Sequence, residues 1–168
     1  MADEKNQNLI NTVFGALFNA QSVYLPPESV AKFNKEVATF FFKKAKNETD
    51  AKLQTFCIDK GLTFVTEADH LRMAASWIES GKITIEEEEL ACELTNEHKY
   101  DILKRYYACD VFSLDDKKAL KQRTLANDQS DNGKKVSQIC DSSLPDAALK
   151  EKLWNEITDF ESKDTLIQ

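Results

Sequence analysis

The stretch NLINTVFGALFNAQSVYLPPESVAKFNKEVATFFFKKAK, residues 8–46, indicates how this chain folds. Its first half carries apolar side chains at helical spacing, with polar residues between them: Leu9, Ile10, Val13, Phe14, Leu17 and Phe18. Pro26 and Pro27 end this helix, and Pro27 suits the first turn of a second helix that ends in lysines. Two helices joined by so few residues pack antiparallel, so the stretch predicts a helical hairpin.

The second helix of this hairpin contains three consecutive phenylalanines. The residues expected to face inward are Val30, Phe33, Val37, Phe40 and Phe41. Because three successive residues of a helix cannot all face one side, Phe42 is predicted to be the one that points away from the core.

The rest of the chain repeats a pattern of capping residue, helix and short turn. Segments with this pattern are 49–61, 66–81, 84–90, 95–109, 113–126, 134–140 and 143–159. The expected caps are Thr49, Ser113, the capping boxes Thr66–Asp69 and Thr84–Glu87, and the terminating glycines Gly61 and Gly81. Pro145 is expected to begin the last helix, with a buried stripe of Leu149, Leu153, Trp154 and Ile157.

These segments predict an all-α protein of about nine helices without a sheet. Short turns between helices of similar length favour stacked antiparallel hairpins, an α-α solenoid, over a closed four-helix bundle. The strings SLDDKKALK, from Ser113, and SLPDAALKE, from Ser143, are similar and lie one paired-helix repeat apart. We therefore predict a single helical domain over residues 1–168.

Composition excludes several classes of protein. The 168 residues carry a net charge of −7 with 42% hydrophobic residues, and only Arg72, Arg105 and Arg123 are arginines, so a nucleic-acid-binding surface is not expected. No run is long and apolar enough for a membrane span, and residues 1–15 lack the features of a secretory signal. Four widely spaced cysteines fit a reduced, cytoplasmic setting.

Several strings together resemble one known family. These are WIESGKI, the Ile-Leu-x-Arg helix at Ile102, the D-x-S-D-x-G turn at residues 128–133, and Cys140 followed by LPDA and Trp154. The order and spacing of these strings resemble the C-terminal helical domain of zinc aminopeptidases of the puromycin-sensitive and aminopeptidase-N type. The resemblance covers about residues 6–159, leaving 160–168 as a tail.

This resemblance implies a HEAT- or armadillo-like superhelix that shapes a peptide chamber beside a catalytic domain. It implies no catalysis by this chain, because the H-E-x-x-H zinc signature and the G-A-M-E-N loop are both missing from the sequence. The only histidines, His70 and His98, lie 28 residues apart. We therefore expect no enzyme activity, no catalytic residue, no metal site and no cofactor.

Three other groups of residues have alternative interpretations. A Cys–His nucleophilic pair needs proximity that only the fold can supply, and helix-face cysteines are usually small buried hydrophobes. His98 beside Asp101 is able to orient a metal, but an exposed histidine in a first helical turn is commoner. The acidic run at 86–89 can attract a cation, yet an acidic first turn that complements the helix dipole explains it more simply.

The N-terminal helix is the candidate interface. Its apolar residues, Leu9, Ile10, Val13, Phe14, Leu17 and Phe18, span roughly 180°, wider than the ~100° needed for one neighbouring layer. The chain is expected to begin partway through a solenoid, so this face is predicted to contact a protein partner, a second copy of the chain, or the catalytic part of an aminopeptidase. The alternative is that the next two helices enclose it completely.

Two functions remain open from the sequence. One is a non-catalytic aminopeptidase-like domain that shapes a peptide chamber or mediates protein interactions. The other is a stand-alone scaffold or assembly subunit derived from that domain, with no peptidase role.

Overall fold

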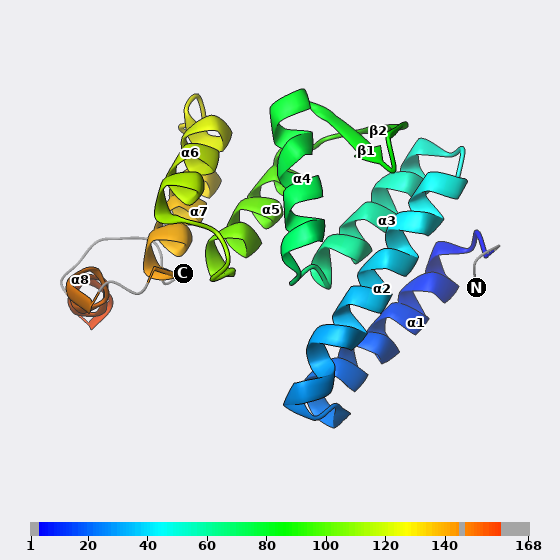
Figure 1. The fold of residues 1–168 in the computed structure, drawn as a ribbon, viewed down its shortest axis with the longest axis horizontal. Helices are drawn as coiled ribbons and strands as arrows, with labels where there is room; N and C mark the ends of the chain where they lie inside the picture. Colours follow the sequence, from blue (N-terminus) through cyan, green and yellow to red (C-terminus); the bar gives the residue numbers. More distant parts are fainter. Residues whose placement is uncertain (1–3, 145–146, 159–168) are drawn as a thin grey trace.

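The computed structural model describes residues 4–144 and 147–158. Within them the chain forms eight α-helices, one π-helical segment and one two-stranded antiparallel sheet, in chain order (Figure 1). The elements are α1 (Gln7–Asn19), η1 (Ala20–Tyr24), α2 (Pro27–Asn47), α3 (Ala51–Thr63), α4 (Ala68–Ser80), β1 (Lys82–Ile85), β2 (Glu88–Glu93), α5 (Asn96–Ala108), α6 (Leu114–Leu125), α7 (Asp131–Ser142) and α8 (Ala147–Thr158). The predicted mostly helical class is confirmed, whereas the stacking of the hairpins into a HEAT-like superhelix stays a prediction.

The helices follow one another along the long axis of the molecule. Helices α1, α2 and α3 lie at one end, α4 and the hairpin in the middle, and α6 and α7 beyond α5 (Figure 1). Helix α1 lies at the outer edge, with α2 between it and α4. None of the described helices is both long enough and apolar enough to cross a membrane.

Capping side chains set most helix starts. Ser113 accepts a hydrogen bond from the Asp116 amide at 3.1 Å, as predicted, and Pro27 occupies the first turn of α2. Asp50 rather than Thr49 caps α3, because its carboxylate reaches the Lys52 amide at 2.9 Å. The prediction of a Thr66–Asp69 capping box was wrong, because α4 starts after Glu67 without a side-chain cap.

Residues 84–90 were predicted as a helix and form most of a β-hairpin instead. Glu86 and Glu87 have φ values of 50° and 68°, the left-handed conformation of a tight hairpin turn. The flanking strands bury Ile83, Ile85 and Leu90 in alternation with exposed residues, which is the period of a strand. Burial of this alternating set against α3 outweighed the helix-start signal at Thr84.

The acidic run therefore lies in the hairpin and not in a first helical turn. Lys46, in the last turn of α2, donates to Glu86 at 2.7 Å and lies 3.6 Å from Glu88. Hydrogen bonding to Lys46 lowers the pKa of the Glu86 carboxyl. These carboxylates hold the hairpin next to α2.

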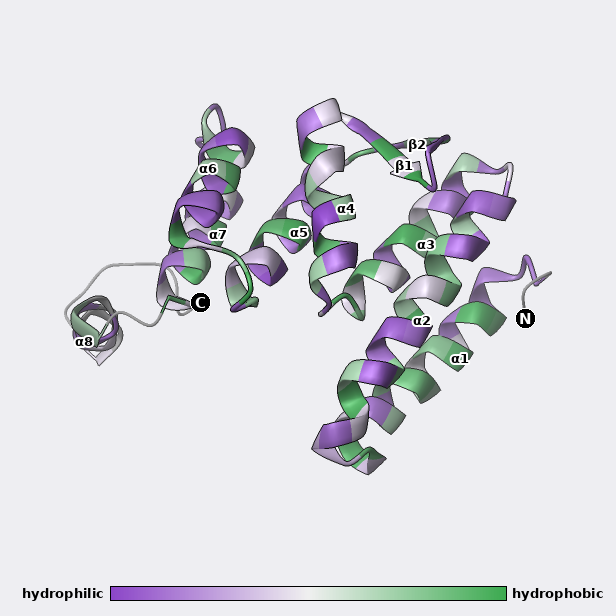
Figure 2. Cartoon of the chain, viewed as in Figure 1, coloured by the Kyte–Doolittle hydropathy of each residue, from purple (hydrophilic) through white to green (hydrophobic). Residues whose placement is uncertain are grey.

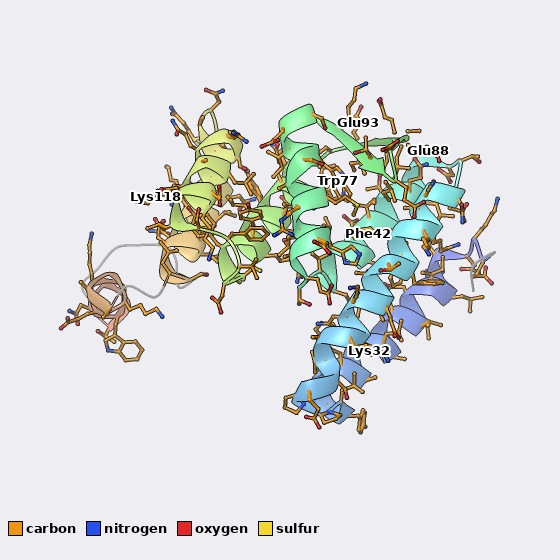
Figure 3. All side chains as sticks on the ribbon, in the orientation of Figure 1. Lys32, Phe42, Trp77, Glu88, Glu93 and Lys118 are labelled. Carbon is orange, nitrogen blue, oxygen red and sulfur yellow. The ribbon has the colours of Figure 1, made fainter. Side chains whose placement is uncertain are left out.

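The core of the described residues runs from Ile10 in α1 to Cys140 in α7. Its largest fully buried side chains include Trp77, Tyr107, Phe41 and Phe64. Phe42 is 2% exposed and buried, so the prediction that it points away was wrong; Phe40 is the partly exposed member of the three. Phe42 lies on the side of α2 that faces α4, where its ring packs edge-on against Trp77 (Figure 3).

Two glycines predicted as helix ends behave differently. Gly81 ends α4 in the left-handed conformation, with φ at 73°, as predicted. Gly61 lies inside α3 and does not end it. A Cβ at position 61 would lie 2.7 Å from the Phe42 ring, so this glycine permits close packing of α3 on α2.

The last helix differs from its prediction. Trp154 in α8 is 65% exposed, so the prediction that this side chain is buried was wrong. The side chains of Leu149, Leu153 and Ile157, and residue Pro145, lie outside the described residues.

Candidate protein interface

Helix α1 forms from a sequence that is rich in asparagine, glutamine and apolar residues. The Asn6 side chain caps it by accepting from the Asn8 amide at 3.0 Å. After Asn19 the helix widens into the π-helical segment η1, and Leu25 then takes an extended conformation before the two prolines.

The structure divides the six predicted interface residues into two groups. Ile10 is fully buried, and Phe14 and Leu17 pack against the core. The exposed residues are Leu9 at 54%, Val13 at 39% and Phe18 at 45%. The prediction that Ile10 belongs to an exposed interface was therefore wrong, because α2 and α3 cover its side of the helix. That the exposed residues of α1 form an interface stays a prediction.

Aromatic packing fixes α1 to the body of the molecule. The Phe14 ring lies 6.1 Å from Phe41 and 5.6 Å from Phe64, edge-on in both cases. The Lys60 ammonium lies 4.3 Å above the Phe14 ring, and Phe18 makes an edge contact with Phe64 at 6.5 Å. Because its inner face is held by these contacts, the outer face of α1 has a defined orientation.

A row of apolar residues, mostly exposed, begins on the outer face of α1 and continues into η1. We call it the α1 stripe: Leu9, Val13 and Ala16 in α1, then Ala20 and Val23 in η1. Val23 is 67% exposed and Ala16 is also exposed, while Ala20 is half-buried. Figure 2 shows hydrophobic residues along α1, interrupted by hydrophilic ones, on the edge of the molecule. Sequence reasoning missed Ala16, Ala20 and Val23, although their alternating three- and four-residue spacing from Leu9 was visible.

The α1 stripe lies in an uncharged part of a highly charged chain. Residues 6–27 contain no Asp, Glu, Lys, Arg or His, whereas 30% of the chain is charged. It is the longest uncharged run in the sequence. Charged residues are depleted in the centre of protein interfaces, because burying an unmatched charge is costly.

A second candidate is an open groove of about 750 Å³ between α5, α6 and α7. Its lining includes Tyr107, Lys118, Lys121, Leu125 and Asp141. The Lys121 ammonium donates to the Asp141 carboxylate at 2.5 Å and to the Ser137 carbonyl at 3.2 Å, so its charge is already neutralised within the fold. The groove lining also carries Lys118, Lys134 and Asp128, so it mixes charges of both signs and gives no clear indication of a ligand.

The two histidines have structural roles. His98 is 2% exposed and was wrongly expected on the surface. Its Nδ1 accepts from the Thr95 amide at 3.2 Å, so the ring proton resides on Nε2, which donates to Asp59 at 2.8 Å. His98 thus caps its own helix and joins α5 to α3, whereas His70 contacts Thr39 at 3.2 Å and Phe42.

The structure also tests the cysteines as nucleophiles and the His, Cys, Asp and Glu side chains as metal ligands. Burial raises the pKa of the Cys57 and Cys140 thiols to about 11, so both are protonated at neutral pH and are poor nucleophiles. Within residues 4–144 and 147–158, no three His, Cys, Asp or Glu side chains are grouped so as to hold a metal ion.

Comparison with known proteins adds no relative. No family model, no curated protein and no solved structure matches this chain. The resemblance to aminopeptidase C-terminal domains therefore stays a prediction from sequence motifs, and the α1 stripe is the feature on which a function can be argued.

Proposed function

We propose that this chain is a non-catalytic helical module that binds a protein through the α1 stripe. The observation that carries the proposal is an exposed apolar row within the longest uncharged run of a chain that is otherwise rich in charge. A row of this kind costs free energy while it faces water, and covering it recovers roughly 25 cal/mol per Å² of apolar surface.

The way α1 is held supports binding by this face. Ile10 and Phe14 fix the inner side of the helix against α2 and α3, so the outer side chains need little ordering when a partner arrives. A preordered surface loses less conformational entropy on binding than a flexible segment does.

Two sequence-based roles are compatible with this surface. In an aminopeptidase-like assembly, the stripe would contact the catalytic part, and the helical array would shape the peptide chamber. In a stand-alone scaffold, it would contact another subunit. Both roles require the same covered α1 face, so the binding surface is tested first.

A photo-cross-linking residue at Val13 tests the proposed surface in the cells that make the protein. We expect a discrete protein adduct from position 13 and none from Asn11, which is exposed on α1 but lies off the stripe. The adduct should disappear when Ala16 is replaced by Glu, because the substitution puts a charge in the contact. Equal labelling from positions 13 and 11, or no adduct from either, would contradict the proposal.

Absence of peptidase chemistry is a separate prediction. The purified chain should hold no stoichiometric zinc and release no amino acid from aminoacyl substrates, because the sequence has no pair of histidines one helical turn apart. Metal analysis and a fluorogenic aminoacyl assay check this. Turnover that copurifies with the chain through several steps and stops on adding a chelator would overturn it.

A further inference from the structure

His70 lies in the contact between α2 and α4. Its Nε2 is 3.2 Å from the hydroxyl oxygen of Thr39, which lies one turn before Phe42 on α2. The Phe42 ring packs edge-on against His70, with 5.5 Å between the ring centroids, and against Trp77, which lies two turns beyond His70 on α4 (Figure 3). A change in the charge of His70 therefore acts directly on the side chains that join these two helices.

The second ring nitrogen of His70 has no hydrogen-bond partner. Nδ1 is buried and bonds to no described residue. A neutral ring fits this environment when Nε2 carries the proton and donates to Thr39, because Nδ1 then holds only a lone pair. A protonated ring carries N–H groups on both nitrogens, so it would bury a donor without an acceptor together with a positive charge. The geometry of the contact therefore favours the neutral ring.

The charged groups around His70 are already paired with one another. Lys35 on α2 lies 2.8 Å from Glu67 at the start of α4, and Asp69 lies 2.8 Å from Arg72. Burial has the largest effect on the pKa of His70 and lowers it, whereas Glu67 and Asp69 raise this pKa and Lys35 lowers it. Among the described residues, the charges that act on the ring thus come from α2 and the start of α4, and not from β1, α5 or α6, which also pack on α4.

We propose that His70 is a pH-sensitive contact in this fold: when its ring takes up a proton in mildly acidic solution, α4 loosens from α2. The charged ring regains solvation by moving away from Thr39 and Phe42, and the contact of Phe42 with Trp77 weakens as a result. Helix α3 still packs on β2 and α5, so we expect a local loosening and not unfolding. The inference concerns α2 and α4 and does not depend on the α1 stripe as a binding surface.

The lowered pKa of His70 sets the direction of the pH dependence. In the unfolded chain a histidine titrates near about pH 6.5, whereas the pKa of His70 in the folded protein is lower. Between these two pKa values the unfolded chain binds more protons than the folded protein, so the free energy of unfolding falls as the pH falls. The stability that the neutral ring contributes is present above about pH 6.5 and is lost as the pH drops toward the folded pKa.

Urea denaturation of the full chain at about pH 7.5 and about pH 5 tests this dependence. His70→Gln keeps a side chain that can hydrogen-bond to Thr39 but cannot take up a proton. We expect the urea midpoint of the wild type to fall more over this interval than that of His70→Gln. His98 and the carboxylates titrate in both proteins, so the difference between the two falls isolates His70. Equal falls would overturn the proposal.

Thr39→Asp is a second variant that reverses the electrostatics of the same contact. A carboxylate beside Nε2 favours the protonated ring, so the loss of stability in acid should become smaller than in the wild type. This variant keeps His70 itself and tests the contact independently of the His70→Gln protein. A loss in acid as large as that of the wild type would show that the charge of His70 does not control the contact.

Trp77 fluorescence reports the loosening itself. Trp154, the other tryptophan, is 65% exposed, so Trp154→Phe leaves Trp77 as the single reporter. In this background, acidification should shift the emission to longer wavelength with an unchanged helical circular dichroism spectrum, and His70→Gln should remove the shift. The midpoint of the shift should match that of the His70 ring signals in an NMR titration, which the His70→Gln spectrum assigns. Emission that ignores pH, or that shifts equally without His70, would overturn the proposal, as would a His70 midpoint at or above about pH 6.5.

Discussion

Replacing Trp77 by alanine is expected to lower the free energy of unfolding by about 3–5 kcal/mol, the usual cost of deleting a large buried aromatic side chain. Trp77 belongs to α4 and is fully buried on the side that faces α2 and the hairpin, and its ring centroid lies 5.8 Å from that of Phe42 (Figure 3). Its indole N–H also donates to the Thr84 carbonyl at 2.7 Å, so the substitution removes the partner of a strand carbonyl. Urea denaturation followed by circular dichroism measures the loss.

Two variants separate the packing of Trp77 from its hydrogen bond. Trp77→Phe keeps a ring beside Phe42 but loses the N–H, so it should cost less than Trp77→Ala. Trp154→Ala removes the same side chain from a position that is 65% exposed, and it should change stability by no more than about 0.5 kcal/mol. A Trp77→Ala loss below about 1 kcal/mol, or a larger loss from Trp154→Ala, would contradict this description of the core.

Helices with strong local signals were predictable from the sequence. Pro27 at the start of α2, Ser113 at the start of α6 and Gly81 at the end of α4 act through their immediate neighbours. Such signals require no knowledge of distant segments, because the backbone groups that they satisfy lie within a few residues.

The hairpin was missed because two local signals compete at residues 82–93. Thr84 and the four glutamates fit a helix start, and glutamate rarely takes the left-handed conformation that a tight turn demands. Ile83, Ile85, Leu90 and Cys92 alternate with polar residues, which favours strands. The contact that favours the strands comes from α2 and α3, far away in sequence, and the spacing of residues alone does not reveal it.

The sequence predicted the width of the apolar surface of α1, but not which part of it is exposed. The sequence showed that apolar residues cover about half of α1, but it did not show which half meets α2 and α3. Phe64 lies about 50 residues beyond Phe14, and its contact with that ring decides that Ile10 and Phe14 face inward. The outward half then emerges as the α1 stripe, so tertiary contacts were needed to divide one amphipathic helix into anchor and surface.

Replacing Gln54 by leucine is expected to cost about 2–6 kcal/mol, although leucine is similar in size and more apolar. Gln54 is 4% exposed in α3, and its side chain makes two hydrogen bonds to backbone groups in other segments. The amide donates to the Glu48 carbonyl at 2.8 Å, and the side-chain oxygen accepts from the Cys92 amide at 3.1 Å. Leucine would remove both side-chain partners from buried backbone groups, at about 1–3 kcal/mol each. Urea denaturation measures the total.

A polar residue in a helix gives no sequence signal that it joins three segments, so Gln54 resembles any surface glutamine until the fold is known. Gln122→Leu on α6 is the matched control, because Gln122 is exposed and the same exchange there should change stability by no more than about 0.5 kcal/mol. Amide hydrogen exchange adds a local measurement, since Gln54→Leu should speed exchange at Cys92 in β2 more than at Leu103 in the centre of α5. Equal costs for the two leucine variants, with unchanged exchange at Cys92, would show that Gln54 does not hold β2 on the helices. The expected result instead makes the Gln54 side chain one of the links between the end of α2, α3 and the hairpin. Together with the Trp77 hydrogen bond and the buried strand residues, it helps to hold a two-stranded sheet in an otherwise helical chain.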